Sequence, residues 1–427
     1  MNLTVDVHIR FLQRDFVAGR LWMRTTHGNE GASFEYAEDW LAFTWAFALD
    51  PALPLGRGVF HTDKTRKIFS FLTDCMPDRW GRTLIMQQVI RQAEYLGKMP
   101  NTLTEANFLL SVNDTLRQGA LRFTHADTNH FLRSEGGVPA LVSLGGLLSA
   151  SGNIQKNAYT DKDMQTLLEP GSSLGGARPK AGIQDGRGVL WIAKFPAARD
   201  DWDVALWEYV ALTLAHKAGL QTPAFRLEKI TGKNVLLVRR FDRDASGRIP
   251  FASAMTMLNL RDREQASYAD IADVLRAGGS APENDLRELW KRMIFNAAIS
   301  NVDDHLRNHG FLRESAGWRL SPVYDLESTP PLYKSPRQNT SVLPGSGGSS
   351  LDNVYEEALA VSELFGVSLA QARAAILSID ETAASWLTVA RAAKASKADI
   401  DVMAPAFATK MPRNFAKIHT ASKAASA

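Results

Sequence analysis

Cysteine is almost absent from this chain of 427 residues, which contains only Cys75. A single thiol excludes an internal disulfide framework, so the composition is typical of a protein from a reducing compartment. Long apolar runs are absent as well, because none approaches the ~20 residues that a membrane-spanning helix requires. The first seven residues also lack the charged-then-apolar pattern of a signal peptide. We therefore expect a cytoplasmic protein with no membrane partner.

An excess of charge of one sign is also missing. The chain has 49 Lys and Arg against 46 Asp and Glu, which gives a formal net charge of +3. This surplus is too small to argue for nucleic-acid binding by itself. A hydrophobic content of 45% and a charged content of 22% are those of an ordinary globular protein, and the length allows two or three compact parts.

The first half of the chain reads mainly as strands. Short strands and turns are expected over the first 60 residues, followed by a helix over 83–95. The segment 145–152 is rich in glycine and serine. A hairpin is predicted farther on, with strands over 180–183 and 189–194.

The second half reads mainly as helices. An amphipathic helix is expected over 203–217, and a strand over 235–238 follows it. Apolar residues recur at helical spacing from 286 to 297, and Ser368 begins a capping box of another helix. Strands first and helices last predict a two-lobed α+β enzyme with a cleft between the lobes.

A polar loop over residues 300–309 has the most informative spacing. Asp303 lies five residues before Asn308, between a predicted helix and a predicted strand. Protein kinases use this spacing, since the aspartate accepts the proton of the substrate hydroxyl and the asparagine holds Mg²⁺. Asp304 is the rival base, but it lies one residue too close to Asn308.

Other parts of a phosphotransfer site follow in the order of a kinase. Lys194 ends an apolar strand, as the phosphate-binding lysine of kinases does, and Glu208 on the next helix is its candidate partner. A second hairpin, over 310–313 and 318–320, leads to Asp325, the candidate second metal ligand. This ordered set is much less probable by chance than any single member.

A glycine loop over residues 172–180 precedes the lysine strand. Its paired glycines would let backbone amides approach phosphates closely, although Pro179 removes one donor. The candidate phosphate contacts in this loop are Leu174, Gly175, Gly176, Ala177, Arg178 and Lys180. A plain glycine turn is the alternative interpretation.

A transition-metal site is the competing interpretation of the polar loop. Its ligands would be Asp303, Asp304, His305 and His309, and two histidines four residues apart on a helix can share a metal. The segment has the composition of a loop, however, and no H-E-x-x-H motif accompanies it.

Together these motifs resemble the HipA family of bacterial serine/threonine kinase toxins. The resemblance covers nearly the whole chain and is carried by residues 76–82, 176–180, 193–196, 240–243, 300–308 and 324–326. It implies a protein-kinase-like α+β fold with a HipA N-terminal subdomain over 1–115, a kinase N-lobe over 116–240 and a helical C-lobe over 241–427.

The resemblance also implies a role for each matching position. Asp303 would be the base, and ATP would be bound with Mg²⁺ on Asn308 and Asp325. Lys194 would hold the phosphates, and Ser173, with Ser172 as its rival, would be autophosphorylated to shut the enzyme. The hinge beside the adenine and the remaining nucleotide contacts and supporting groups would be Arg239, Arg240, Phe241, Asp242, Glu208, His305, Arg307 and Tyr324.

Partners and departures are implied in the same way. Family members pair with a small helix-turn-helix antitoxin, HipB, so DNA would be contacted only through that complex, and one family target is an aminoacyl-tRNA synthetase. Here Arg239 replaces an acidic hinge residue, and Asp304 replaces the usual glycine and adds negative charge near the phosphates. A non-catalytic corepressor on a kinase-like scaffold and a kinase for a small metabolite are the alternative functions.

Overall fold

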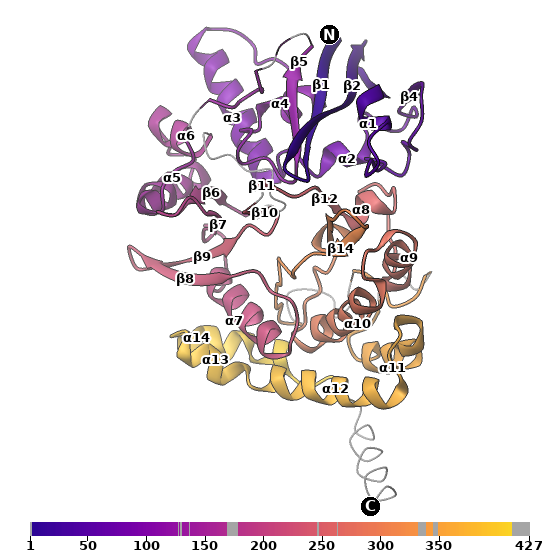
Figure 1. Cartoon of the computed structure of the whole chain (residues 1–427). Helices are drawn as coiled ribbons and strands as arrows, with labels where there is room; N and C mark the ends of the chain where they lie inside the picture. Colours follow the sequence, from indigo (N-terminus) through magenta and orange to yellow (C-terminus); the bar gives the residue numbers. More distant parts are fainter. Residues whose placement is uncertain are drawn as a thin grey trace, which may run out of the picture. The chain divides into compact units, whose positions relative to one another are not determined.

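The computed structural model describes residues 2–126, 128, 130–135, 137–168, 178–245, 247–262, 264–331, 339–344 and 349–411. The chain divides into two compact units (Figure 1). The first unit comprises Met1–Arg199, Glu228–Arg261 and Leu312–Ser315, and the second comprises Asp200–Leu227, Asp262–Phe311 and Ala316–Ala427. Within the described residues, no helix combines the length and the apolar character needed to cross a membrane.

A five-stranded antiparallel sheet opens the first unit. Its order is β4-β3-β2-β1-β5, and the strands are β1 (Asn2–Phe11), β2 (Arg14–Thr26), β3 (Asn29–Tyr36), β4 (Val59–His61) and β5 (Leu121–His125). Alternate residues of β1, from Val5 to Phe11, are buried, which is the period of two that predicted a strand. A side chain at Gly19 would meet the carbonyl oxygen of Glu35 at 2.2 Å, so the close strand pairing requires glycine there.

The first unit also contains helices, some of which lie between the strands of this sheet in the chain. They are α1 (Glu38–Leu41), α2 (Ser70–Thr73), α3 (Arg79–Tyr95), α4 (Glu105–Ser111), α5 (Leu144–Gln155), α6 (Asp161–Leu168) and α8 (Ala254–Met257). α3 starts earlier than the predicted residue 83, because the Asp78 carboxylate caps it by accepting from the Gly81 amide at 2.6 Å. α5 forms in the segment rich in glycine and serine, since its buried leucines outweigh the low helix propensity.

A second sheet of this unit has the order β6-β7-β9-β8. Its strands are β6 (Lys180–Gln184), β7 (Leu190–Lys194), β8 (Phe225–Ile230) and β9 (Lys233–Arg239). The predicted hairpin is therefore present, and the Asp185 carboxylate closes its turn by accepting from the amides of Arg187 and Val189. Ala181, Ile183 and Leu237 of this sheet lie in one apolar cluster with leucines of α5 and α6. Short strands follow at β10 (Arg243–Asp244), β11 (Gly247–Arg248) and β12 (Phe251–Ser253).

The second unit is mainly helical, as predicted. Its elements are α7 (Val204–Lys217), α9 (Tyr268–Gly278), α10 (Pro282–Ala298), β13 (Gly310–Arg313), β14 (Trp318–Leu320), α11 (Val354–Ala360), α12 (Leu369–Ala384), α13 (Trp386–Ala392) and α14 (Lys397–Met403). α10 is the central helix, and α9, α11 and α12 pack against it (Figure 1). Trp290, Met293 and Ile294 of α10 are fully buried, in agreement with the helical spacing of the apolar residues.

We expect Ser368→Ala to lower the free energy of unfolding by about 1 kcal/mol. Ser368 caps α12, and its hydroxyl and amide exchange hydrogen bonds with the Gln371 side chain and amide, as the predicted capping box requires. Urea unfolding measures the effect. Ser378→Ala, at an exposed position inside the same helix, is the control and should change stability little. Equal losses in both variants would contradict the role of the cap.

Candidate active site

A strained backbone turn connects α10 to the polar loop. Ser300 has φ +52°, a left-handed conformation that non-glycine residues adopt rarely. Its hydroxyl donates to the Ala406 carbonyl at 2.6 Å, and the Asn301 amide donates to the Asn296 carbonyl at 2.8 Å. The surrounding helices therefore hold the turn, which aims the following residues away from the helix axis.

Hydrogen bonds to the main chain close the loop around Asp303. The carbonyl oxygen of Asp303 accepts from the His305 amide at 2.9 Å and from Asn308 Nδ2 at 3.0 Å. The Asn308 amide donates to the His305 carbonyl at 2.8 Å, within a short 3-10 turn at Leu306–Asn308. The candidate base and the candidate amide ligand are thus joined directly, and both side chains are partly buried.

The Tyr324–Asp325 pair is tied to the same loop. The Tyr324 hydroxyl donates to the Arg307 carbonyl at 2.6 Å, so the chain before Asp325 is anchored to the loop. Asp325 itself has φ +52°, which aspartate tolerates better than most residues do. The Arg307 guanidinium pairs with Asp262 at 2.7 Å, and a contact of Arg307 with nucleotide stays a prediction.

The side chain of Asp304 is buried inside the second unit, whereas that of Asp303 is only partly buried. It is 1% exposed, one carboxylate oxygen accepts from the Tyr268 hydroxyl, and the other lies 2.9 Å from His309 Nε2. Burial, followed by the charge of Asp304, raises the pKa of Tyr268 well above its ordinary value, so the hydroxyl remains a donor. The expected extra negative charge near the phosphates is therefore enclosed in the protein, engaged with two partners.

These contacts also bear on the two possible metal sites. Asp304 and His309 contact each other, and the described residues contain no group of three or more His, Cys, Asp or Glu arranged to hold a metal. The second candidate set, Asn308 and Asp325, fits Mg²⁺, because this ion prefers oxygen ligands and binds few protein groups. Asn308 commits Nδ2 to the Asp303 carbonyl, so its Oδ1 and the Asp325 carboxylate are the oxygen atoms that would hold the ion, and this role stays a prediction.

Two candidate phosphate-binding residues, Lys180 and Lys194, lie on the second sheet. Lys194 at the end of β7 is partly buried and pairs in register with Lys180 of β6. Lys180 is 5% exposed, and its ammonium nitrogen lies 3.1 Å from a carboxylate oxygen of Asp78, the cap of α3. This buried ion pair therefore joins the first residue of β6 to the start of α3.

The described residues include only the last part of the predicted glycine loop. Ser172, Ser173, Leu174, Gly175, Gly176 and Ala177 lie outside the described residues. Arg178 is described and partly buried. Glu208 lies on α7 in the second unit and is buried, whereas Lys194 belongs to the first unit. Their pairing stays a prediction.

The predicted hinge turns most of its polar side chains inward. Arg239 is exposed, Phe241 is partly buried, and Arg240 and Asp242 are 2% and 3% exposed. The Arg240 guanidinium donates to both carboxylate oxygens of Asp242, at 2.8 and 2.5 Å, and to the Leu116 carbonyl at 2.6 Å. Arg240 therefore holds residues 239–242 from the buried side, and a contact of this segment with adenine stays a prediction.

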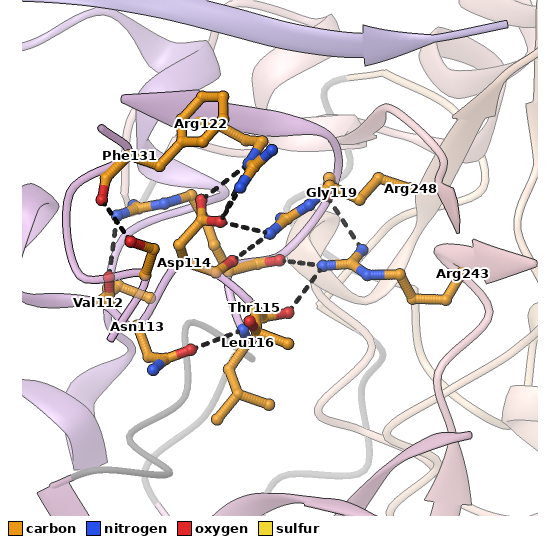
Figure 2. A network of polar contacts seen from close by, with 12 residues as sticks. Val112, Asn113, Asp114, Thr115, Leu116, Gly119, Arg122, Phe131, Arg243 and Arg248 are labelled. Atoms are coloured by element: carbon orange, nitrogen blue, oxygen red, sulfur yellow. Dashed lines mark hydrogen bonds and ion pairs between the residues drawn. The ribbon is translucent and has the colours of Figure 1, made fainter. Parts of the chain in front are cut away.

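A polar network joins Arg243 and Arg248, which follow the predicted hinge, to residues 114–119 (Figure 2). The Asp114 carboxylate accepts from Arg122 at 2.6 Å and from Arg248 at 3.1 Å. Arg243 donates to the carbonyls of Thr115 and Gly119 and to the Asp242 carboxylate. Sequence reasoning missed this network, because the bonds of Arg243 and Arg248 to residues 114–119 join positions more than 100 residues apart, which leave no local spacing signal.

The sequence of the chain is similar to known protein families. Two family models match, the HipA-like C-terminal domain over residues 172–395 and the HipA N-terminal domain over residues 11–98. The putative kinases Y4mE and Y4dM of Sinorhizobium fredii are each 28% identical, over 149 and 166 residues. These matches cover 32% and 35% of this chain but only 34% and 40% of the relatives, so the chain spans well under half the length of either relative.

A solved structure has the same fold. It is the toxin–antitoxin system HipA, HipB and its operator DNA complex of Shewanella oneidensis MR-1, which matches with a TM-score of 0.65 and 16% identity over 94% of this chain and 95% of that chain. The α+β fold predicted for the chain is confirmed. Since the C-terminal family model alone covers just over half of the 427 residues, the protein belongs to the HipA family.

Proposed function

We propose that the protein is an ATP- and Mg²⁺-dependent serine/threonine protein kinase. The observation that carries the proposal is the closed loop in which Asn308 holds the main chain of Asp303, with Asp325 anchored beside it through Tyr324. A base, an amide and a carboxylate in this order are what a kinase needs for proton removal and metal binding. The match to putative kinases supports the same conclusion.

Each residue has one task in the proposed reaction. Asp303 accepts the proton of a serine or threonine hydroxyl, whose oxygen forms a bond to the γ-phosphorus of ATP. The bond from that phosphorus to the β–γ bridging oxygen breaks, and ADP leaves. Bound Mg²⁺ neutralises charge on the phosphate oxygens, and Asn308 and Asp325 would hold it. Lys194 fixes the phosphates in line with the hydroxyl, partnered by Glu208.

The acceptor and the partner follow from the family. We propose autophosphorylation of Ser173, with Ser172 as its rival, which would inactivate the enzyme. A small HipB-like antitoxin would bind the protein and contact DNA, as supported by the related structure solved with HipB and operator DNA. The protein would then act as a toxin that inhibits translation, for example by phosphorylating an aminoacyl-tRNA synthetase.

Phosphosite mapping tests the activity directly. Purified protein incubated with ATP and Mg²⁺ should gain phosphate at Ser173 or Ser172, detected by mass spectrometry, and chelation of the metal should abolish the gain. Asp303→Asn is the control for contaminating kinases. If neither this protein nor added proteins gain phosphate and ATP does not bind, the proposal is wrong. ATP consumption only with small metabolites would instead indicate a metabolite kinase.

A further inference from the structure

The residue after the candidate base is held by its side chain from α9. Asp304 accepts from the Tyr268 hydroxyl, and Tyr268 is the first residue of α9. Asn296 Nδ2 donates to the same hydroxyl at 3.0 Å, so α10 fixes the phenol from another direction. The His309 ring meets the Tyr268 ring edge to face at 5.3 Å and lies 2.9 Å from the Asp304 carboxylate. The side chain of Asp304 is therefore held by the Tyr268 hydroxyl and lies against the His309 ring.

The main chain of the same residue is held by the 339–344 segment. The carbonyl oxygen of Asp304 accepts from the Thr340 amide at 2.9 Å and from the Thr340 hydroxyl at 2.6 Å. Ser341 follows Thr340 in the chain, and its carbonyl oxygen accepts a hydrogen bond from the Tyr268 amide at 2.8 Å. These contacts form a closed ring that runs from Tyr268 through Asp304 and Thr340 to Ser341 and back to Tyr268.

All members of the ring are enclosed. Tyr268, Asp304 and Thr340 are at most 1% exposed, and Ser341 is 5% exposed. In a buried polar network, each lost hydrogen bond leaves a desolvated group without its partner, which costs free energy. The loss of one bond of the ring is therefore expected to weaken the others. The cavity lined by Asp304 and His309 is also lined by Asn308 and Tyr324, so the ring directly adjoins the candidate site.

We infer that Asp304 is a positioning residue, through which the docking of the 339–344 segment on α9 sets the orientation of Asp303. The inference rests on the proposed kinase function, since Asp303 is its base. Asp304 and Asp303 are joined by a peptide bond, so a displacement of residue 304, which is held through its carbonyl and its carboxylate, moves the main chain of Asp303 as well. A displacement of about 1 Å at a reacting group can cost as much as 10²-fold in rate. Detachment of the segment would therefore switch the base off without touching nucleotide.

Tyr268→Phe removes the hydroxyl from the ring. We expect kcat for phosphoryl transfer to fall about 10- to 10²-fold while KM for ATP stays unchanged, because no nucleotide contact is altered. Hydrogen exchange at the Thr340 amide should become faster, because that amide donates to Asp304. Tyr355→Phe is the matched control, since Tyr355 is also fully buried and donates to a carboxylate, that of Asp380 at 3.0 Å. It should change neither kcat nor the exchange of Thr340.

A second pair of variants serves if Tyr268→Phe fails to fold. Thr340→Val removes the hydroxyl bond to Asp304 and should lower kcat, whereas Thr340→Ser keeps the hydroxyl and should restore it. In addition, Asp304→Asn combined with Tyr268→Phe should be no slower than Asp304→Asn alone, since both act on one contact.

The outcomes separate this inference from the proposed function. Unchanged kcat and unchanged Thr340 exchange in Tyr268→Phe would overturn the inference while the kinase stands. Equal effects of Tyr268→Phe and Tyr355→Phe would also overturn it, because general destabilisation would then explain both. A third outcome is that the wild-type protein transfers no phosphate, while exchange of the Thr340 amide is faster in Tyr268→Phe and unchanged in Tyr355→Phe. This outcome would support the ring of contacts and refute the kinase function.

Discussion

Replacing Asp303 with asparagine should lower phosphoryl transfer about 10²- to 10⁴-fold, the usual contribution of a general base. Asparagine has almost the same shape but accepts no proton at its amide. The bonds that close the loop, from His305 and Asn308, go to the main-chain carbonyl of Asp303, which the variant keeps. The loss should therefore be one of chemistry rather than of folding, and the affinity for ATP should remain.

The measurement is the rate of phosphate incorporation at saturating ATP, with calorimetric titration of ATP as the check on binding. Asp273→Asn is the matched control, because Asp273 lies on α9 with its side chain 75% exposed in a surface pair with Arg276. It should keep wild-type activity. A rate for Asp303→Asn within tenfold of wild type would exclude Asp303 as the base.

Replacing Asp242 with asparagine should lower the free energy of unfolding by about 3–5 kcal/mol, the usual cost of removing one partner from a buried ion pair. The Asp242 side chain is 4% exposed and is shared by Arg240 and Arg243, at 2.5 and 2.9 Å. The Asp242 carboxylate also accepts a hydrogen bond from the Gly119 amide at 2.7 Å. Asparagine would leave the two guanidinium groups buried without their counter-charge.

Urea unfolding at neutral pH measures this loss. Glu38→Gln is the control within the same unit, because the pair of Glu38 with Arg57 is exposed, at 69% and 81% of the two side chains. Exposed pairs contribute only about 0–1 kcal/mol. A loss for Asp242→Asn no greater than that of Glu38→Gln would show that the network does not stabilise the hinge.

The same carboxylate should make stability depend on pH in acid. Burial has the largest influence and raises the pKa of Asp242, but the charges of Arg240 and Arg243 and the bonds to Arg240 and Gly119 outweigh it and hold the pKa below its ordinary value. The unfolded chain titrates near its usual ~3.9. The stabilisation is thus complete above about pH 4 and is lost as the pH falls toward the folded-state pKa. Asp242→Asn should lack this part of the pH profile.

Much of the fold could be predicted because its signals are local. The hairpin of β6 and β7, the helix α7 and the capping box at Ser368 all appear where residue spacing placed them. The sequence gives no clear signal where packing outweighs propensity. α5 forms in the segment with repeated glycines because Leu147, Leu148 and Ile154 are buried together.

The candidate site divides along the same line. Spacing distinguishes Asp303 from Asp304 as the base, and the structure adds that Asp304 is buried against Tyr268 and His309. No local pattern announces that contact, because Tyr268 lies 36 residues earlier. The engagement of Lys180 by Asp78 was equally invisible, since only the packing of the sheet on α3 brings them together.

The sequence by itself determined the order of the chemical groups, from Lys194 through Asp303 and Asn308 to Asp325, and with it the family. Short-range spacing suffices for this, because each motif lies within one turn or strand. Only the tertiary structure decided which charged groups are enclosed: Asp304, next to the candidate base Asp303, and Arg240 with Asp242 in the predicted hinge. Burial depends on what distant segments cover a residue, and no residue's own neighbours in sequence specify that.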